Sequence, residues 1–80
     1  MTKRISILGS TGSIGRQTLD VAEKLQISVA ALAASRNVDL LEAQCRKFRP
    51  ELAVLFDEAA AEELKRRLSD MNIKVAGGME

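Results

Sequence analysis

The feature that most constrains this chain is an apolar run followed by three evenly spaced glycines near its start. The run is Ile5–Leu8, and the glycines stand at positions 9, 12 and 15. Apolar residues then return at helical spacing, at Leu19, Ala22 and Leu25. Because buried parallel strands read as near-continuous apolar runs, this order predicts a strand, a tight turn and a helix. A dinucleotide-binding unit requires the same succession of elements.

Each glycine of this turn has its own expected role. Gly9 reverses the chain, Gly12 leaves room for a pyrophosphate against the backbone, and Gly15 lets the helix pack closely on the strand. The unpaired N–H groups of the first helical turn, at the positive end of the helix dipole, would then bind the phosphates. The predicted cofactor-binding residues of this turn are Gly9, Ser10, Thr11, Gly12, Ser13, Ile14 and Gly15. Of these, Thr11, Gly12, Ser13 and Ile14 would hold the pyrophosphate, with added hydroxyls from Thr11 and Ser13.

Two alternatives to a dinucleotide-binding turn are a Walker phosphate loop and a turn without a ligand. The spacing is GxxGxxG, and a Walker phosphate loop would need a Gly-Lys pair that the sequence lacks. A tight strand-to-helix turn that binds nothing stays open as an alternative.

The end of the next apolar run, Ile27–Ala33, indicates which dinucleotide is preferred. In NAD-specific folds an acidic residue after the second strand binds the ribose hydroxyls. Here the run is followed by Ser35, Arg36 and Asn37, and no carboxylate occurs before Asp39. Arg36 can form a charge-assisted contact with the 2′-phosphate of NADP, with hydrogen bonds from Ser35 and Asn37, so NADPH is favoured over NADH. Alternatively, Arg36 is an ordinary surface residue and Asn37 caps the next helix, or Asn37 does both.

The rest of the chain continues the alternation of strands and helices. We expect helices over 13–25, 38–48 and 58–69, strands over 27–33, 52–56 and 72–76, and a turn at 77–78. Asp57 should cap the last helix, in which Glu62–Arg66 and Glu63–Arg67 are spaced as ion pairs. The pattern predicts the α/β class: a Rossmann-like, doubly wound parallel sheet, βαβαβαβ, in three layers. A strand order of 3-2-1-4 would place the third helix on the face opposite the first two.

The amino-acid composition limits the partners that this chain can be expected to bind. The chain is 46% hydrophobic with net charge +1, and its only aromatic residues are Phe48 and Phe56. We therefore expect neither nucleic acid nor a membrane as a partner. The sequence contains no histidine. Its single cysteine, Cys45, is interpreted as a packing residue. Because one cysteine cannot form an internal disulfide, we expect a reducing, cytoplasmic compartment. Apolar sheet surface left uncovered should make the chain a homo-oligomer.

Several stretches together resemble the 1-deoxy-D-xylulose 5-phosphate reductoisomerase family. They are Gly-Ser-Thr-Gly-Ser-Ile-Gly at 9–15, Gln-Thr-Leu-Asp-Val at 17–21, and segments at 31–38, 44–50 and 53–57. The resemblance implies an NADPH-dependent oxidoreductase and isomerase of isoprenoid biosynthesis that also needs Mg or Mn. Such enzymes convert 1-deoxy-D-xylulose 5-phosphate to 2-C-methyl-D-erythritol 4-phosphate. Family members usually carry glycine where Ser35 stands.

Family members are several times longer than this chain, and their metal and substrate sites lie beyond the matched region. Residues 1–80 are therefore expected to be the N-terminal part of the NADPH-binding domain, with no metal site or catalytic residue and no activity alone. The alternatives are another NADP-dependent dehydrogenase, such as a semialdehyde dehydrogenase, and a non-catalytic nucleotide-sensing module.

Overall fold

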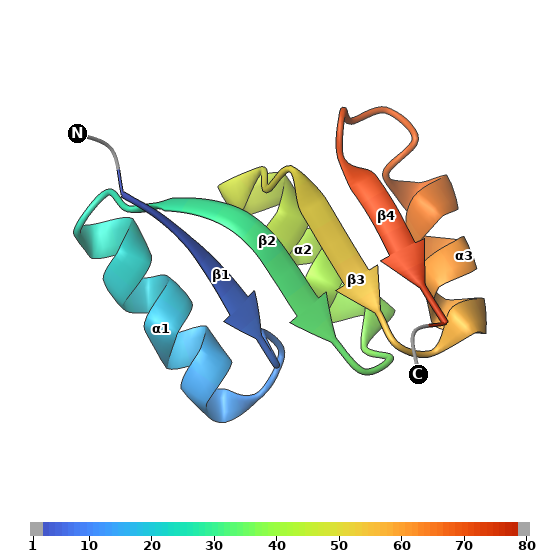
Figure 1. Ribbon diagram of the computed structural model, residues 1–80, viewed down its shortest axis with the longest axis horizontal. Coiled ribbons are helices and arrows are strands. Elements are labelled where there is room, and N and C mark those ends of the chain that lie inside the picture. The colour runs from blue at the N-terminus through green and yellow to red at the C-terminus, as the bar shows by residue number, and fades with distance from the viewer. Residues whose placement is uncertain (1–2, 79–80) are drawn as a thin grey trace.

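Three helices alternate with four strands along the chain (Figure 1). The structure is a computed structural model and describes residues 3–78. The elements are β1 (Arg4–Leu8), α1 (Ser13–Lys24), β2 (Ser28–Ala34), α2 (Val38–Phe48), β3 (Leu52–Leu55), α3 (Glu58–Arg67) and β4 (Lys74–Gly77). Their bounds lie within two residues of the predicted ones, and Gly77 ends β4 instead of opening a turn. The Rossmann-like α/β fold is confirmed.

The four strands form one parallel sheet in the order β1-β2-β3-β4. The predicted order 3-2-1-4 is therefore wrong. β4 does not pair with β1; it adds to the free edge of β3, where Leu52 is in register with Lys74. All three crossovers step in the same direction across the sheet.

All three helices consequently lie on one face of the sheet, because right-handed crossovers that step the same way cover the same face. The Lys47 ammonium lies 3.0 Å from the Glu23 carboxylate, which joins α2 to α1. The Arg67 guanidinium lies 2.6 Å from the Asp39 carboxylate, which joins α3 to α2. The expectation that α3 lies on the opposite face is therefore also wrong, and residues 3–78 form two layers (Figure 1).

The hydrophobic core fills the space between the sheet and these helices. Leu41 of α2 and Leu64 of α3 are fully buried against Leu32 and Leu55 of the central strands. Cys45 is buried in the same cluster, and burial raises the pKa of its thiol to about 11. The cysteine is therefore a packing residue, as its helical spacing predicts.

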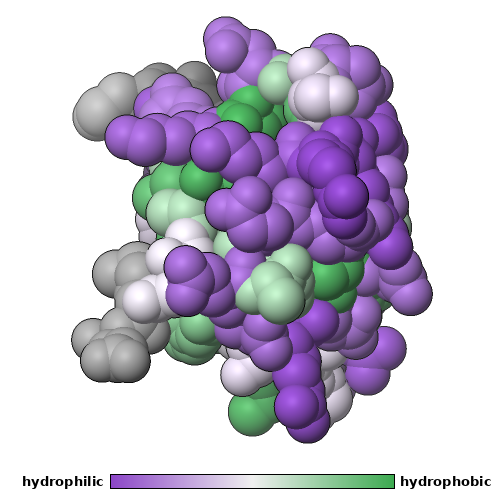
Figure 2. Space-filling model, turned by 90° about the vertical axis from the view of Figure 1, so that its right-hand side faces the viewer, coloured by the Kyte–Doolittle hydropathy of each residue, from purple (hydrophilic) through white to green (hydrophobic). Residues whose placement is uncertain are grey.

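The opposite face of the sheet carries no helix from residues 3–78. In register across the four strands, one row on this face consists of Leu8, Ala33, Val54 and Ala76. Side chains alternate between the faces of a strand, and the neighbours of this row belong to the core beneath the helices. Figure 2 shows the molecule from the β4 and α3 side, with hydrophilic surface over the helix and hydrophobic atoms towards the helix-free face.

Candidate functional site

The glycine turn is held closely against the end of the neighbouring strand. Gly9 has φ of 72°, a left-handed conformation that glycine adopts without strain. The N–H groups of Gly9 and Ser10 both donate to the carbonyl of Ala33, at 2.7 and 2.9 Å. The N–H of Gly12 donates to the carbonyl of Gly9 at 3.0 Å. Backbone hydrogen bonds thus define most of this turn.

An added Cβ would have different surroundings at Gly15 and at Gly12. A Cβ at position 15 would overlap the carbonyl oxygen of Gly9 and lie 2.7 Å from the Cα of Ser10. Position 15 therefore needs glycine so that α1 can pack on the turn, as predicted. A Cβ at position 12 would meet only the Gly9 carbonyl oxygen, at 3.4 Å, which is an ordinary contact. The chain itself does not fill the space beside Gly12.

The helix after this turn begins with unpaired N–H groups. α1 starts at Ser13, its N-cap Gly12 supplies no side chain, and its first-turn hydrogen bond runs from the Arg16 N–H to the Gly12 carbonyl at 2.9 Å. Within the described residues, no hydrogen-bond acceptor faces the N–H of Thr11, Ser13 or Ile14. Together with the positive end of the helix dipole, these donors suit an anionic group.

The segment after β2 lies at the same edge of the sheet, because parallel strands end together and Leu8 pairs with Ala33. The side chains of Ser35 and Arg36 are exposed, and no carboxylate among residues 3–78 pairs with Arg36. The Oδ1 of Asn37 accepts from the N–H of Leu40 at 3.1 Å, so Asn37 caps α2. Its amide nitrogen is left for another acceptor. The structure thus brings the two predicted groups of site residues to one edge.

Ser10 lies beneath the site and not at its surface. It is fully buried, and its N–H is bonded to Ala33. Its carbonyl accepts a hydrogen bond of 2.7 Å from the Nε2 of Gln44, on α2. No role was assigned to Gln44 from the sequence, and this contact was missed. The available signal was a glutamine one turn after Leu41 on the buried face of a helix, since buried amides need partners.

Two exposed apolar side chains stand on either side of the glycine turn in the sequence. Leu8 ends β1 with 83% of its surface exposed, and Ile14 in the first turn of α1 is 77% exposed. Ile14 was predicted to bind the cofactor through its backbone N–H, and its side chain was given no role. Nothing in the sequence pattern distinguished Leu8 from a buried strand residue. The elements that meet at this edge therefore carry unpaired N–H donors and exposed apolar side chains.

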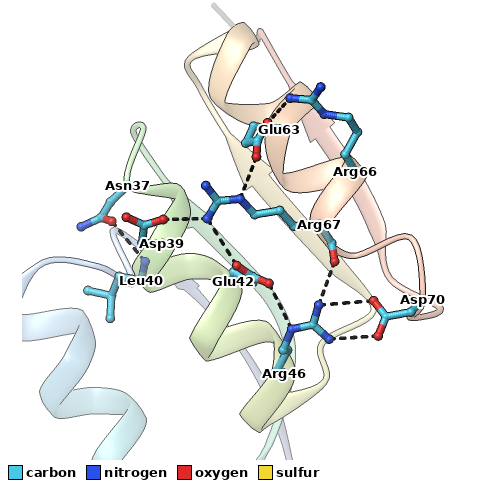
Figure 3. A network of polar contacts seen from close by, with 9 residues as sticks. All are labelled: Asn37, Asp39, Leu40, Glu42, Arg46, Glu63, Arg66, Arg67 and Asp70. Carbon is cyan, nitrogen blue, oxygen red and sulfur yellow. Dashed lines mark hydrogen bonds and ion pairs between the residues drawn. The ribbon is translucent and has the colours of Figure 1, made fainter.

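Charged side chains link α2 and α3 just beyond the Asn37 cap (Figure 3). Arg67 pairs with Asp39 and with Glu63, and this raises the pKa of the Arg67 guanidinium. Asp39, the first carboxylate after β2, is thereby paired with a cation. The predicted Glu63–Arg67 ion pair is confirmed, at 2.9 Å. The predicted Glu62–Arg66 ion pair is wrong, because Arg66 pairs with Glu63 instead.

The described residues contain no metal-binding cluster. No three side chains of His, Cys, Asp and Glu gather in residues 3–78 as a metal site needs. None of the helices there combines the length and apolar content that crossing a membrane demands. The donors at the edge of the sheet fit the phosphates of a dinucleotide; they do not fit a divalent cation, which prefers oxygen ligands.

Comparison with known proteins relates this site to one enzyme family. A sequence model of 1-deoxy-D-xylulose 5-phosphate reductoisomerase matches residues 5–80. The reductoisomerase of Acetivibrio thermocellus is 59% identical over 80 residues, which is 100% of this chain and 21% of that protein. That of Moorella thermoacetica is 55% identical over 82 residues and is also covered to 21% of its length.

Solved structures agree with these sequence matches. The reductoisomerase from Zymomonas mobilis in complex with NADPH superposes with a TM-score of 0.90 at 33% identity, over 96% of this chain and 21% of that one. A reductoisomerase in complex with magnesium superposes with a TM-score of 0.89 at 26% identity, over 98% of this chain and 20% of that one. This chain thus spans about a fifth of the length of its relatives. It belongs to the 1-deoxy-D-xylulose 5-phosphate reductoisomerase family.

Proposed function

We propose that this chain is the N-terminal part of the NADPH-binding domain of a 1-deoxy-D-xylulose 5-phosphate reductoisomerase. The observation that carries the proposal is the row of unpaired N–H groups at Thr11, Ser13 and Ile14. They open α1 beside Gly12, where the chain leaves space, so a diphosphate can approach the backbone. The related structure from Zymomonas mobilis, described as a complex with NADPH, supports the same cofactor.

The 2′-phosphate of NADPH is assigned to the segment after β2. Arg36 is exposed and has no carboxylate partner within residues 3–78, so its guanidinium is available for a charged acceptor. Ser35 and the amide nitrogen of Asn37 add neutral donors beside it. The carboxylate of Asp39, which would repel a phosphate, is paired with Arg67 at 2.6 Å.

The whole protein's reaction is part of this proposal. A reductoisomerase rearranges 1-deoxy-D-xylulose 5-phosphate and reduces it to 2-C-methyl-D-erythritol 4-phosphate. NADPH supplies the hydride, and the part played by residues 3–78 is to bind and orient that cofactor. We place the substrate and the Mg or Mn ion on the remaining four-fifths of the family length and expect the 80-residue chain alone to be inactive. A cytoplasmic location fits the single, buried thiol of Cys45.

Titration with NADPH and NADH tests the assignment of Arg36. In a full-length reductoisomerase that begins with this chain, the wild type should prefer NADPH, and Arg36→Ala should remove most of that preference. A hydrogen bond to a charged group contributes roughly 1.5–3 kcal/mol, which corresponds to about 10- to 150-fold in affinity. Isothermal titration calorimetry measures both affinities.

The matched control is Arg66→Ala, which removes an exposed arginine near the far end of α3. This variant should keep the preference of the wild type. Equal affinity of the wild type for NADPH and NADH would contradict the role of Arg36. Failure to bind either cofactor would contradict the proposed function itself.

A further inference from the structure

One peptide of the glycine turn is fixed by a side chain from another element. The carbonyl of Ser10 accepts a 2.7 Å hydrogen bond from the Nε2 of Gln44, which is 93% buried in the middle of α2. The other hydrogen bonds of the turn join backbone groups: Gly9 and Ser10 to Ala33, and Gly12 to Gly9. The orientation of the Ser10–Thr11 peptide therefore depends on α2.

The direction of this carbonyl determines the direction of the next N–H. The described residues contain no cis peptide bond, and in a trans peptide the C=O and N–H groups point in opposite directions. Because the carbonyl of Ser10 points inward to Gln44, the N–H of Thr11 points outward. No acceptor among residues 3–78 faces that N–H.

The opposite orientation of the peptide would be unfavourable for a phosphate ligand. With the peptide reversed, the carbonyl oxygen of Ser10 would face the site and repel an anion, and the N–H of Thr11 would be lost as a donor. Gln44 disfavours that state, because reversal would leave its own buried amide without an acceptor.

From this geometry we infer that Gln44 is a positioning residue for the cofactor: it holds the Ser10–Thr11 peptide so that the N–H of Thr11 is directed at the diphosphate. The inference rests on the proposed function, since it assigns a further residue to the same site. Gln44 does not touch the ligand, and its effect is confined to the diphosphate half of the site. Recognition of the 2′-phosphate at Arg36 does not depend on it.

The test separates the two halves of the site with two probes. ADP carries a diphosphate and no 2′-phosphate, and 2′-AMP carries a 2′-phosphate and no diphosphate. Gln44→Met keeps the length and packing of the side chain but cannot donate. In the full-length protein, this substitution should lower the affinity for ADP and for NADPH roughly fivefold, which corresponds to the loss of one neutral hydrogen bond. The affinity for 2′-AMP should stay within about twofold of the wild type.

Cys45→Ala is the control for a general loss of stability. It truncates the adjacent buried side chain of α2, which no hydrogen bond joins to the turn. Thermal unfolding establishes that each variant is folded at the temperature of the titration. If Gln44→Met does not fold, Gln44→Leu takes its place, because leucine is also apolar and cannot donate a hydrogen bond.

The outcomes are distinct. Selective loss of ADP and NADPH affinity in the Gln44 variant, with Cys45→Ala unchanged, supports the inference. Unchanged ADP affinity, an equal loss for ADP and 2′-AMP, or the same loss in Cys45→Ala would overturn it while leaving the cofactor assignment in place. A wild type that binds neither ADP nor NADPH would instead overturn the proposed function.

Discussion

Gly12 and Gly15 share a sequence motif but carry different constraints. At position 15 the constraint comes from the protein, because a Cβ would overlap the backbone of Gly9 and Ser10. At position 12 the chain would tolerate a Cβ, and under the proposed function the need for glycine there comes from the diphosphate. Substituting each glycine with alanine therefore separates folding from binding.

We expect Gly15→Ala to destabilise the 80-residue chain by about 1–3 kcal/mol, the usual cost of overpacking against immobile atoms. Gly12→Ala should cost less than about 1 kcal/mol, as a change of N-cap from glycine to alanine does. Thermal unfolding of both variants checks this order. The reverse order would show that the turn is packed differently.

The same pair should give the opposite order in cofactor binding. In the full-length protein, Gly12→Ala should lower the affinity for NADPH roughly tenfold, because the new methyl group occupies the space left for the diphosphate. NADPH titration measures the loss. An unchanged affinity would mean that the cofactor does not approach the backbone at Gly12.

The predictability of single residues depends on how far away their partners are. The cap at Asn37 and the close packing at Gly15 follow from neighbours within a few residues; the packing was predicted, and the cap was one of the alternatives given for Asn37. The bond from Gln44 to Ser10 joins residues 34 apart and could not be predicted, since no local pattern says which buried carbonyl an amide will reach.

Between elements, α2 and α3 are joined by ion pairs around Arg46 and Arg67 (Figure 3). The guanidinium of Arg46 contacts both carboxylate oxygens of Asp70, at 3.1 and 3.3 Å, and donates to the carbonyl of Arg67 at 2.8 Å. These hydrogen bonds to Arg46 lower the pKa of the Asp70 carboxyl. They hold α3 beside α2 on one face of the sheet.

The lowered pKa of Asp70 predicts a pH-dependent contribution to stability. A carboxyl with a depressed pKa in the folded state stabilises the fold above its unfolded value of about 4, and this stabilisation is lost as the pH falls through the folded pKa. Asp70→Asn should therefore lower the unfolding temperature of the 80-residue chain at pH 7. The difference from the wild type should shrink as the pH falls below about 4.

Asp20→Asn is the control for this measurement, because Asp20 is an exposed carboxylate of α1 with no ion pair to residues 3–78. It should change the unfolding temperature little at either pH. An Asp70→Asn difference that stays constant down to pH 2 would contradict the role of the carboxylate charge.

For the molecule as a whole, the alternation of strands and helices was predictable and the order of the strands was not. Apolar periodicity reports that a segment is a buried strand, but it does not report which neighbour the strand pairs with. β4 pairs with β3, and α3 lies beside α2, to which charged surface residues join it. The layer arrangement therefore had to come from the structure.

The helix-free face of the sheet leads to the prediction of self-association. Its central row, Leu8, Ala33, Val54 and Ala76, is entirely apolar. We expect the 80-residue chain to associate through this face, and Leu8→Lys, at a position that is 83% exposed, to shift it to a monomer in sedimentation velocity. Ala59→Lys places the same charge on an exposed position of α3 and should leave association unchanged. A wild type that stays a compact monomer at high concentration would contradict this prediction.

The position of α2 has a consequence for how this segment can vary among natural relatives. The helix runs from the Asn37 cap, next to Arg36, to Gln44 under the glycine turn, a rise of about 10 Å over seven residues. Under the proposed function, α2 thus sets the spacing between the residues assigned to the 2′-phosphate and the turn assigned to the diphosphate. A single insertion or deletion within it would rotate everything downstream by about 100°. Length changes should therefore accumulate in the loops and be purged from residues 37–44.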